Sequence, residues 1–285
     1  MSMESVRPVP PPHSETEAMY NGIAALVEAT AGPDRHYGFW AGHQDGASIG
    51  EATGRLTDLV ASKLNVGPGS HVLDVGCGNG GPAVRIAQTS GARVTAIDVD
   101  RQALRNGAER ARSQEVAALV EFRRIDAMDL PFAPASFDAV LAFESTPHFD
   151  IFPLYQGISR VLRPGGRLVV ETPYPRTPMT EETRRRISPY LSMLNAVSLD
   201  PPEQHLSAAR AAGMAAVELI DITDNVRHSF PRLVRGLRER RAHLEAVGGA
   251  AEADRLLDAF SAWADATEIG GVIMTFTRIQ DGALT

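Results

Sequence analysis

The chain has 285 residues, of which 44% are hydrophobic and 22% are charged, and its net charge is −7. This length is enough for one large domain, or for one domain with an insertion, around a packed core. The acidic balance, without a basic stripe, argues against a nucleic-acid partner. No apolar run reaches the about 18 residues of a membrane helix, so we expect no membrane partner. The single cysteine, Cys77, rules out an intrachain disulfide or a cysteine metal cluster. With no signal peptide apparent, we expect a cytoplasmic protein.

The first 66 residues divide into a tail and a helical region. Four prolines among residues 1–13 predict a disordered tail. Residues 14–66 are expected to hold two helices, from Ser14 to about Thr30 and from about Ala47 to Leu64. Between them, the aromatic side chains of Tyr37, Phe39 and Trp40 lie in a loop bounded by glycines. Two interpretations stay open: a packed loop, or a lid that closes over a ligand.

The most informative stretch runs from His71 to Ala87. A short apolar run broken only by Asp74 is followed by glycines, among them Gly76 and Gly78, and then by a helical pattern that begins at Gly81. This predicts a buried strand, a tight turn and a helix whose first N–H groups face a ligand. The pattern also fits a dinucleotide site, but Asp74 would repel a pyrophosphate. The same carboxylate favours a ligand with an ammonium and a sulfonium, which points to S-adenosylmethionine.

Further carboxylates stand where later strands are expected to end. Asp98 closes the strand 93–98, about twenty residues past the glycines, where an acid can bind ribose hydroxyls. Asp100 competes for that role, but we expect it to cap the next helix. Glu144 and His148 follow the strand that begins at Phe137, and Glu171 ends the strand 167–171. Ligands of open α/β sheets bind at such strand ends.

The repeated strand–helix pattern predicts a doubly wound, mostly parallel α/β sheet. Residues 67–172 would form the cofactor-binding core. Six prolines interrupt residues 172–202, so we predict an inserted helical cap over residues 173–214. Residues 215–285 would supply the remaining elements: a strand over 215–222, helices over 227–247 and 251–266, and a strand over 271–278.

Five short motifs between about His36 and Arg167 resemble the class I S-adenosylmethionine-dependent methyltransferases of the small-molecule, bacterial natural-product branch. They are Tyr37-Gly-Phe-Trp40, Leu73-Asp-Val-Gly-Cys-Gly78, Ala96-Ile-Asp98, Phe143-Glu-Ser145 with His148, and Val161-Leu-Arg-Pro-Gly-Gly166. The resemblance implies a seven-stranded Rossmann-like sheet whose last strand is antiparallel. It also implies that Asp126 accepts a hydrogen bond from the adenine amino group beside Ala127, and it places Tyr37 and Phe143 among the cofactor contacts. No metal is implied.

We therefore expect methyl transfer to a small-molecule acceptor, with O-methylation favoured. His148 would remove the hydroxyl proton, and Glu171 would orient the imidazole or act as the base itself. Glu144 would contact the methionine ammonium or the acceptor. An alternative is C-methylation of an alkene such as a prenyl diphosphate, with Glu171 deprotonating the carbocation. A minor alternative is a non-catalytic S-adenosylmethionine-binding protein. A homodimer is possible.

Overall fold

A computed structural model describes residues 26–30, 32, 34, 36–42 and 44–280 of the chain. The tail expected over residues 1–13 lies outside the described residues, as does most of the first expected helix. Residues 26–30 are helical.

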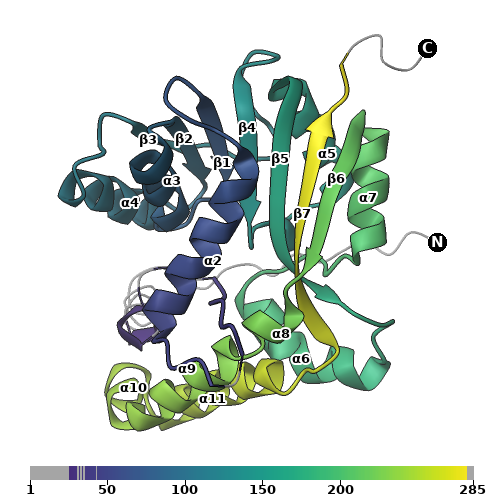
Figure 1. Ribbon diagram of the computed structural model, residues 1–285. Helices are drawn as coiled ribbons and strands as arrows, with labels where there is room; N and C mark the ends of the chain where they lie inside the picture. Colours follow the sequence, from purple (N-terminus) through teal and green to yellow (C-terminus); the bar gives the residue numbers. More distant parts are fainter. Residues whose placement is uncertain (1–25, 31, 33, 35, 43, 281–285) are drawn as a thin grey trace.

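The centre of the molecule is a seven-stranded sheet with the order β3-β2-β1-β4-β5-β7-β6 (Figure 1). Only β7 runs antiparallel to its neighbours, β5 and β6. The strands are β1 (His71–Val75), β2 (Arg93–Asp98), β3 (Val120–Arg124), β4 (Phe137–Phe143), β5 (Leu162–Pro175), β6 (Met214–Asp221) and β7 (Ile269–Arg278). The predicted fold class, including the antiparallel last strand, is confirmed.

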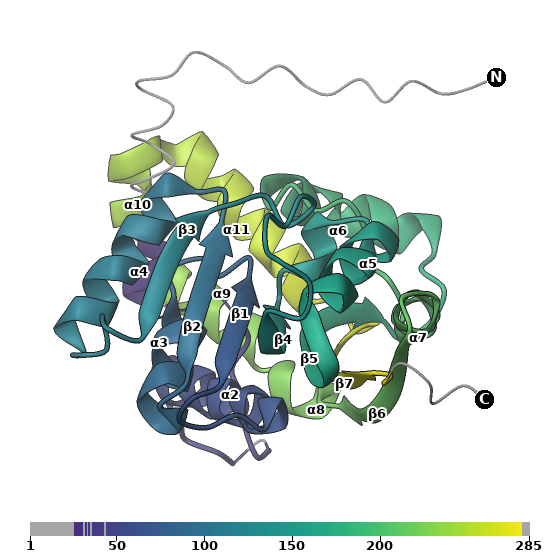
Figure 2. The same ribbon diagram turned by 90° about the horizontal axis from the view of Figure 1, so that it is seen from above.

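Helices cover both faces of the sheet, as doubly wound folds require (Figures 1 and 2). One face packs against α2 (Ile49–Leu64), α3 (Gly81–Ser90) and α4 (Arg101–Ser113). The other packs against α5 (Ile151–Val161) and α7 (Pro202–Ala211). Because side chains alternate along a strand, Val72 joins the first core while Leu73 and Val75 join the second. Strand order reverses between β1 and β4, which places a ligand crevice at their carboxyl ends.

A helical cap lies beside the carboxyl ends of the parallel strands (Figure 1). It consists of α6 (Glu181–Met193), α8 (Thr223–Val226), α9 (Ser229–Glu239), α10 (Arg241–Gly248) and α11 (Ala250–Ala264). Apolar side chains of α6, α9, α10 and α11 form a core separate from those of the sheet. The 3-10 helix η1 (Thr146–His148) follows β4.

Three expectations about individual elements need correction. The single helix predicted over 227–247 is two helices, α9 and α10, because the chain leaves helical geometry at Arg240. Of the segment 173–214, only α6 joins the cap, while α7 packs against α5 and β6. Finally, β5 does not end at Glu171: it continues to Pro175 because it pairs with β7 over its whole second half. The domain boundaries themselves stay a prediction.

Candidate active site

The glycine turn between β1 and α3 has the backbone geometry that the sequence predicts. Gly76 and Gly78 have φ angles of +72° and +51°, where side chains are strained. A Cβ atom on Gly76 would lie 2.6 Å from the Cβ of Ser145, so this turn packs closely against the loop after β4. The corresponding position on Gly78 has no atom within 4 Å and faces open space. The turn can therefore admit a ligand at Gly78.

Asp74 is buried in β1, two residues before Gly76, where the turn begins. Its Oδ2 atom has no hydrogen-bond partner among the described residues. Burial, and then the nearby charge of Asp98, raise the pKa of Asp74 to about 7. A buried carboxylate without a counter-charge is destabilising, and a cationic ligand would relieve it. The residues at this turn therefore fit S-adenosylmethionine, which carries an ammonium and a sulfonium.

Asp98 ends β2 and faces the same turn. Its Oδ2 accepts the backbone N–H of Gly78 at 2.9 Å, and its Oδ1 accepts that of Asp100 at 2.9 Å. Asp100 in turn accepts the backbone N–H groups of Gln102 and Ala103, so its predicted role as the cap of α4 is confirmed. Asp98 is thus the carboxylate fixed beside the glycines, and its role toward ribose hydroxyls stays a prediction.

The loop after β3 presents an exposed acid beside an apolar surface, and the expected contact of Asp126 with the adenine amino group stays a prediction. Asp126 is exposed, and its Oδ1 accepts the backbone N–H of Met128 at 2.9 Å, as in a solvated turn. Ala127 is buried, whereas Met128 and Val99 are 42% and 59% exposed. Large apolar side chains at neighbouring strand ends could contact a flat ring. Val99 was missed by the sequence analysis, although an apolar residue between Asp98 and Asp100 was a possible signal.

Tyr37 links the sheet to the cap. Its backbone N–H donates to Glu144 Oε1, and its phenol oxygen accepts the Nε1–H of Trp263 in α11 at 3.0 Å. The ring of the preceding residue, His36, stacks on Phe143 with centroids 4.1 Å apart. These contacts agree with the first interpretation, a packed loop. Movement of the loop as a lid stays a prediction. Trp263 lies 226 residues from Tyr37 in sequence, so no local motif marked this contact.

Two carboxyl groups meet where β4 ends. Phe143 pairs with Glu171 across the sheet, and the next backbone N–H, that of Glu144, donates to the Glu171 carbonyl at 2.8 Å. Glu144 has the left-handed φ of +48°, an unusual conformation for a residue other than glycine. Glu171 is 0% exposed, and neither carboxyl oxygen has a partner among the described residues. Burial raises the pKa of Glu144 to about 8, and burial with the charge of Glu144 raises the pKa of Glu171 well above its usual range.

His148 lies apart from this pair in the described structure. It ends η1, its side chain is exposed, and its ring makes an edge contact with Phe149. No described hydrogen bond connects its imidazole with Glu171, whose oxygens are unpartnered. The expected orientation of His148 by Glu171 is therefore not seen, because Glu171 points into the protein interior while His148 faces solvent. The assignment of either residue as the base stays a prediction.

A cavity of about 270 Å³ opens on the cap side of Tyr37. Phe230 and Trp263 line it together with Tyr37, and Arg176 and Thr267 line its other side. These residues come from the loop before α2, from the cap and from the ends of β5 and β7. The chain segments are far apart in sequence, which is why no motif marked this cavity.

Within the described ranges, no three His, Cys, Asp or Glu side chains are grouped so that they could hold a metal ion. Likewise, none of the helices in the described part combines the length and hydrophobicity needed to cross a bilayer.

A glycine turn beside an unpaired buried aspartate, at the reversal point of a seven-stranded sheet, defines a nucleoside-binding enzyme of the Rossmann-like class. Comparison with known proteins then gives the family. Residues 73–170 match a family described as "Methyltransferase domain". The 27-O-demethylrifamycin SV methyltransferase of Amycolatopsis mediterranei (strain S699) is 34% identical over 274 residues, covering 93% of this chain and 97% of that protein.

Two solved structures resemble the fold over most of its length. The [4+2]-cyclase SpnF has a TM-score of 0.80 and 30% identity, covering 95% of this chain and 98% of SpnF. Geranyl diphosphate C-methyltransferase from Streptomyces coelicolor A3(2), solved with Mg²⁺, geranyl diphosphate and S-adenosyl-L-homocysteine, has a TM-score of 0.71. It is 21% identical and covers 95% of this chain and 100% of the other, so that likeness shows the fold alone.

The chain belongs to the S-adenosylmethionine-dependent methyltransferases that act on small molecules. Its cofactor is S-adenosylmethionine. Methyl transfer to oxygen is the chemistry better supported among its relatives.

Proposed function

We propose that the protein methylates a hydroxyl group of a secondary metabolite. The observation that carries this proposal is the full-length similarity to a relative whose name specifies an O-demethylated substrate. The glycine turn supports the methyl-donor half of the proposal, since Gly78 faces open space, Asp98 accepts its N–H, and the buried Asp74 Oδ2 has no partner among the described residues. When bound, S-adenosylmethionine supplies a methyl group on a positively charged sulfur. The protein must then align the acceptor oxygen and remove its proton.

We assign proton removal to His148. It follows β4 at the carboxyl edge, and its imidazole makes no hydrogen bond with a described residue, so both ring nitrogens remain available. A ring nitrogen of a neutral imidazole can accept the hydroxyl proton, which suits a general base. Catalytic hydrogen bonds often form only when the substrate is bound, so the exposed position in this structure is compatible with the role.

We assign an electrostatic role to Glu144 and Glu171. The raised pKa of Glu144, about 8, has burial as its first cause, and Glu171 is buried with it. A cation placed near them would stabilise the ionised form of one carboxyl group and be stabilised in return. The ammonium or sulfonium of the cofactor would provide such a charge. This interpretation keeps Glu144 as a cofactor or acceptor contact and needs no hydrogen bond between Glu171 and His148.

C-methylation of an alkene is the second candidate, and Glu171 is the observation that favours it. Both of its oxygens are buried and unpartnered, as a base for a carbocation in an apolar site would be. Addition of the methyl group to the double bond would leave a carbocation, and Glu171 would accept the proton lost as the double bond forms again. Because both carboxyl pKa values are raised, this role requires Glu171 to be ionised by a neighbouring cation.

The deciding experiment follows a labelled methyl group. The protein would be incubated with methyl-labelled S-adenosylmethionine and a panel of hydroxylated polyketides, phenols, glycosides and prenyl diphosphates. Mass spectrometry detects the product, and carbon–proton NMR correlations locate the new methyl on oxygen or carbon. Label on oxygen is expected. Label on carbon would replace the proposal by the second candidate. Cofactor binding without label transfer to any member of the panel would favour the non-catalytic alternative.

We also predict that methyl transfer to a hydroxyl does not depend on added metal, because displacement at sulfur requires none. Treatment with a chelator should leave the rate of methylation unchanged, measured by the same labelled-methyl assay. Loss of activity that magnesium restores would contradict this and would favour a phosphorylated acceptor, since magnesium commonly accompanies phosphates.

We further propose that the protein works in a reducing compartment such as the cytoplasm. The supporting observation is its single cysteine, which is buried in the glycine turn. Fractionation of producing cells, followed by detection of the protein, would test this.

A further inference from the structure

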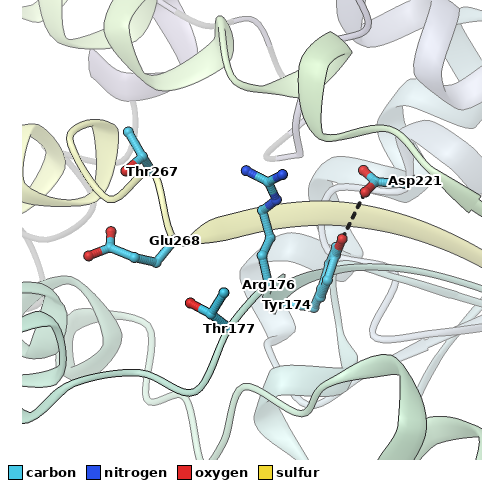
Figure 3. Close-up of a pocket in the computed structure, with 6 residues that line it drawn as sticks. All are labelled: Tyr174, Arg176, Thr177, Asp221, Thr267 and Glu268. Atoms are coloured by element: carbon cyan, nitrogen blue, oxygen red, sulfur yellow. Dashed lines mark hydrogen bonds between the residues drawn. The ribbon is translucent and has the colours of Figure 1, made fainter.

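A second, polar cavity of about 450 Å³ opens at the carboxyl edge of the sheet (Figure 3). Three segments contribute its side chains: the end of β5, the end of β6 and the residues just before β7. Six residues line it: Tyr174, Arg176, Thr177, Asp221, Thr267 and Glu268. All six carry side chains that can donate or accept hydrogen bonds.

Two carboxylates in the cavity are held in place by the protein. Asp221 accepts the hydroxyl of Tyr174 at 2.9 Å and the backbone N–H of Thr223 at 2.8 Å. Glu268 accepts the hydroxyl of Thr183 at 2.8 Å and pairs with Arg186 at 3.2 Å, both on α6. A carboxylate has about four acceptor positions, so each can accept further hydrogen bonds from a ligand.

Three other groups in the cavity have no direct partner among the described residues, although the charge of Arg176 acts on Asp221. The Arg176 guanidinium and the hydroxyls of Thr177 and Thr267 make no hydrogen bond or ion pair with the described part of the chain. Figure 3 shows the Arg176 side chain extending between Tyr174 and the residues before β7. The cavity therefore offers both free donors and free acceptors to a ligand.

Gly270 leaves room for two of these side chains. It pairs with Tyr174 across the antiparallel β5–β7 ladder. A Cβ atom there would lie 2.9 Å from Tyr174 Cε1, 3.0 Å from Arg176 Cγ and 2.3 Å from Thr223 Oγ1. The absence of a side chain at this position lets Tyr174 and Arg176 pack over the strand and keep their places in the cavity.

The polar cavity adjoins the cavity of about 270 Å³ beside Tyr37, which we call the inner cavity. Arg176 and Thr267 line both, and Tyr37 and Trp263 stand at the other side of the inner cavity. The backbone of Tyr37 is in turn bonded to Glu144, next to the buried carboxyl pair. A ligand whose reactive end lies near Tyr37 could thus extend past aromatic side chains into the polar cavity.

The charges in the polar cavity discriminate between polar ligands. A diphosphate would face two carboxylates, Asp221 and Glu268, with only the Arg176 guanidinium free to pair with it. Nearby arginines are already engaged, Arg186 with Glu268 and Arg227 with Asp224. Uncharged hydroxyl groups avoid that repulsion, and each of them both donates and accepts.

We infer that the polar cavity binds an uncharged, hydroxyl-rich part of the acceptor, such as a glycosyl group. The inference deepens the proposed function and rests on it, since it takes the acceptor to be a hydroxylated small molecule that occupies the inner cavity as well.

Binding in the presence of saturating S-adenosyl-L-homocysteine tests the inference without turnover. The probes would be a series of 4-nitrophenyl hexosides and deoxyhexosides, with 4-nitrophenol as the matched aglycone and inorganic diphosphate as the anionic competitor. We expect at least one glycoside to bind about tenfold more tightly than 4-nitrophenol by calorimetry, the effect of one or two added hydrogen bonds. Arg176→Ala and the isosteric Asp221→Asn should each remove about that factor.

Arg184→Ala is the matched control, because Arg184 is exposed on α6 and does not line the cavity. Unchanged affinity for S-adenosyl-L-homocysteine would show that each variant is folded. The inference is overturned if every glycoside binds no better than 4-nitrophenol. It is also overturned if the cavity variants bind as the parent does, or if diphosphate binds more tightly than every glycoside and depends on Arg176. A glycoside that binds as expected but is methylated on carbon would count against the proposed function alone.

Discussion

The two ends of the carboxyl edge are built in different ways. At the β1–β2 end, the hydrogen bonds that hold Asp98 join residues within one strand–helix–strand unit: Gly78 with Asp98, 20 residues apart, and Asp98 with Asp100. At the β5–β6 end, Tyr174, Asp221 and Glu268 come from segments tens of residues apart and meet only in the folded sheet. Different segments therefore form the two ends, so substitutions at the β5–β6 end can alter acceptor specificity without altering the cofactor site.

The loop at Tyr37 is where the two ends are joined. It contacts the core through Glu144 and the cap through Trp263. If the two ends bind cofactor and acceptor separately, variants at the β1–β2 end should change the dissociation constant of the cofactor. Variants at the cap should change the Michaelis constant of the acceptor, and variants between them should change the rate of transfer.

The largest effect is expected from His148→Ala, which lies between the two ends. If His148 is the base, the variant should lower kcat by about 10²–10⁴, the usual contribution of general-base catalysis, and leave cofactor affinity unchanged. Single-turnover rates and calorimetry measure the two quantities. Glu171→Gln is the comparison variant and should be less impaired. The reverse order, with Glu171→Gln nearly inactive and His148→Ala mild, would establish the carbocation chemistry instead. Near-parental rates for both would show that neither residue is catalytic.

A smaller effect is expected from Asp98→Ala at the cofactor end. Loss of its hydrogen bonds should weaken binding of S-adenosylmethionine by about 1–3 kcal/mol, through the ribose contacts and the unpaired N–H of Gly78. Arg184→Ala is a useful control, because Arg184 is exposed on α6 in the cap and has no expected role toward the cofactor. Calorimetry that gives parental affinity for Asp98→Ala would remove Asp98 from the site. Tight binding of NADH by the parent protein would contradict the cofactor assignment.

Cofactor affinity should also depend on pH through Asp74. In the free protein its pKa is about 7, so below that pH the carboxyl is neutral and cannot attract the ligand ammonium. Affinity should therefore rise by up to about tenfold per pH unit as the pH approaches 7 from below, and then level off. The free energy of unfolding of the ligand-free protein should change with pH in the opposite direction. Because folding raises this pKa from 3.8, the free protein loses stability as pH rises from about 4 to about 7.

Calorimetry across that pH range, with Asp74→Asn as the control, measures the first effect. The variant should bind more weakly and with a flatter pH dependence. A pH dependence that persists in Asp74→Asn would assign it to another group.

The smallest effect is expected from Trp263→Phe at the cap end. The substitution removes the hydrogen bond to the Tyr37 hydroxyl but keeps an aromatic ring in the cluster. Denaturant unfolding should show a loss of about 0.5–1.5 kcal/mol in the free energy of unfolding, the usual net value of one hydrogen bond. Tyr37→Phe breaks the same bond from the other side, so the double variant should lose little more than either single one. Fully additive losses would show that the bond does not couple the loop to the cap.

Sequence patterns were enough to predict the sheet, the glycine turn, the acid at the end of β2 and the cap of α4. These features depend on strand alternation, backbone conformation and contacts between near neighbours, and each leaves a mark within a few residues. The same local signals identified the family and the cofactor.

Packing between distant segments determined the arrangement of the β5–β6 end and of the residues beside the cap. It placed α7 on the sheet rather than in the cap, buried Glu171 without partners, left His148 exposed, and set Trp263 against Tyr37. It also brought Arg176, Asp221 and Glu268 around one cavity. Whether a side chain is buried or paired depends on which distant segments pack against it, and the periodicity of its own segment does not record that.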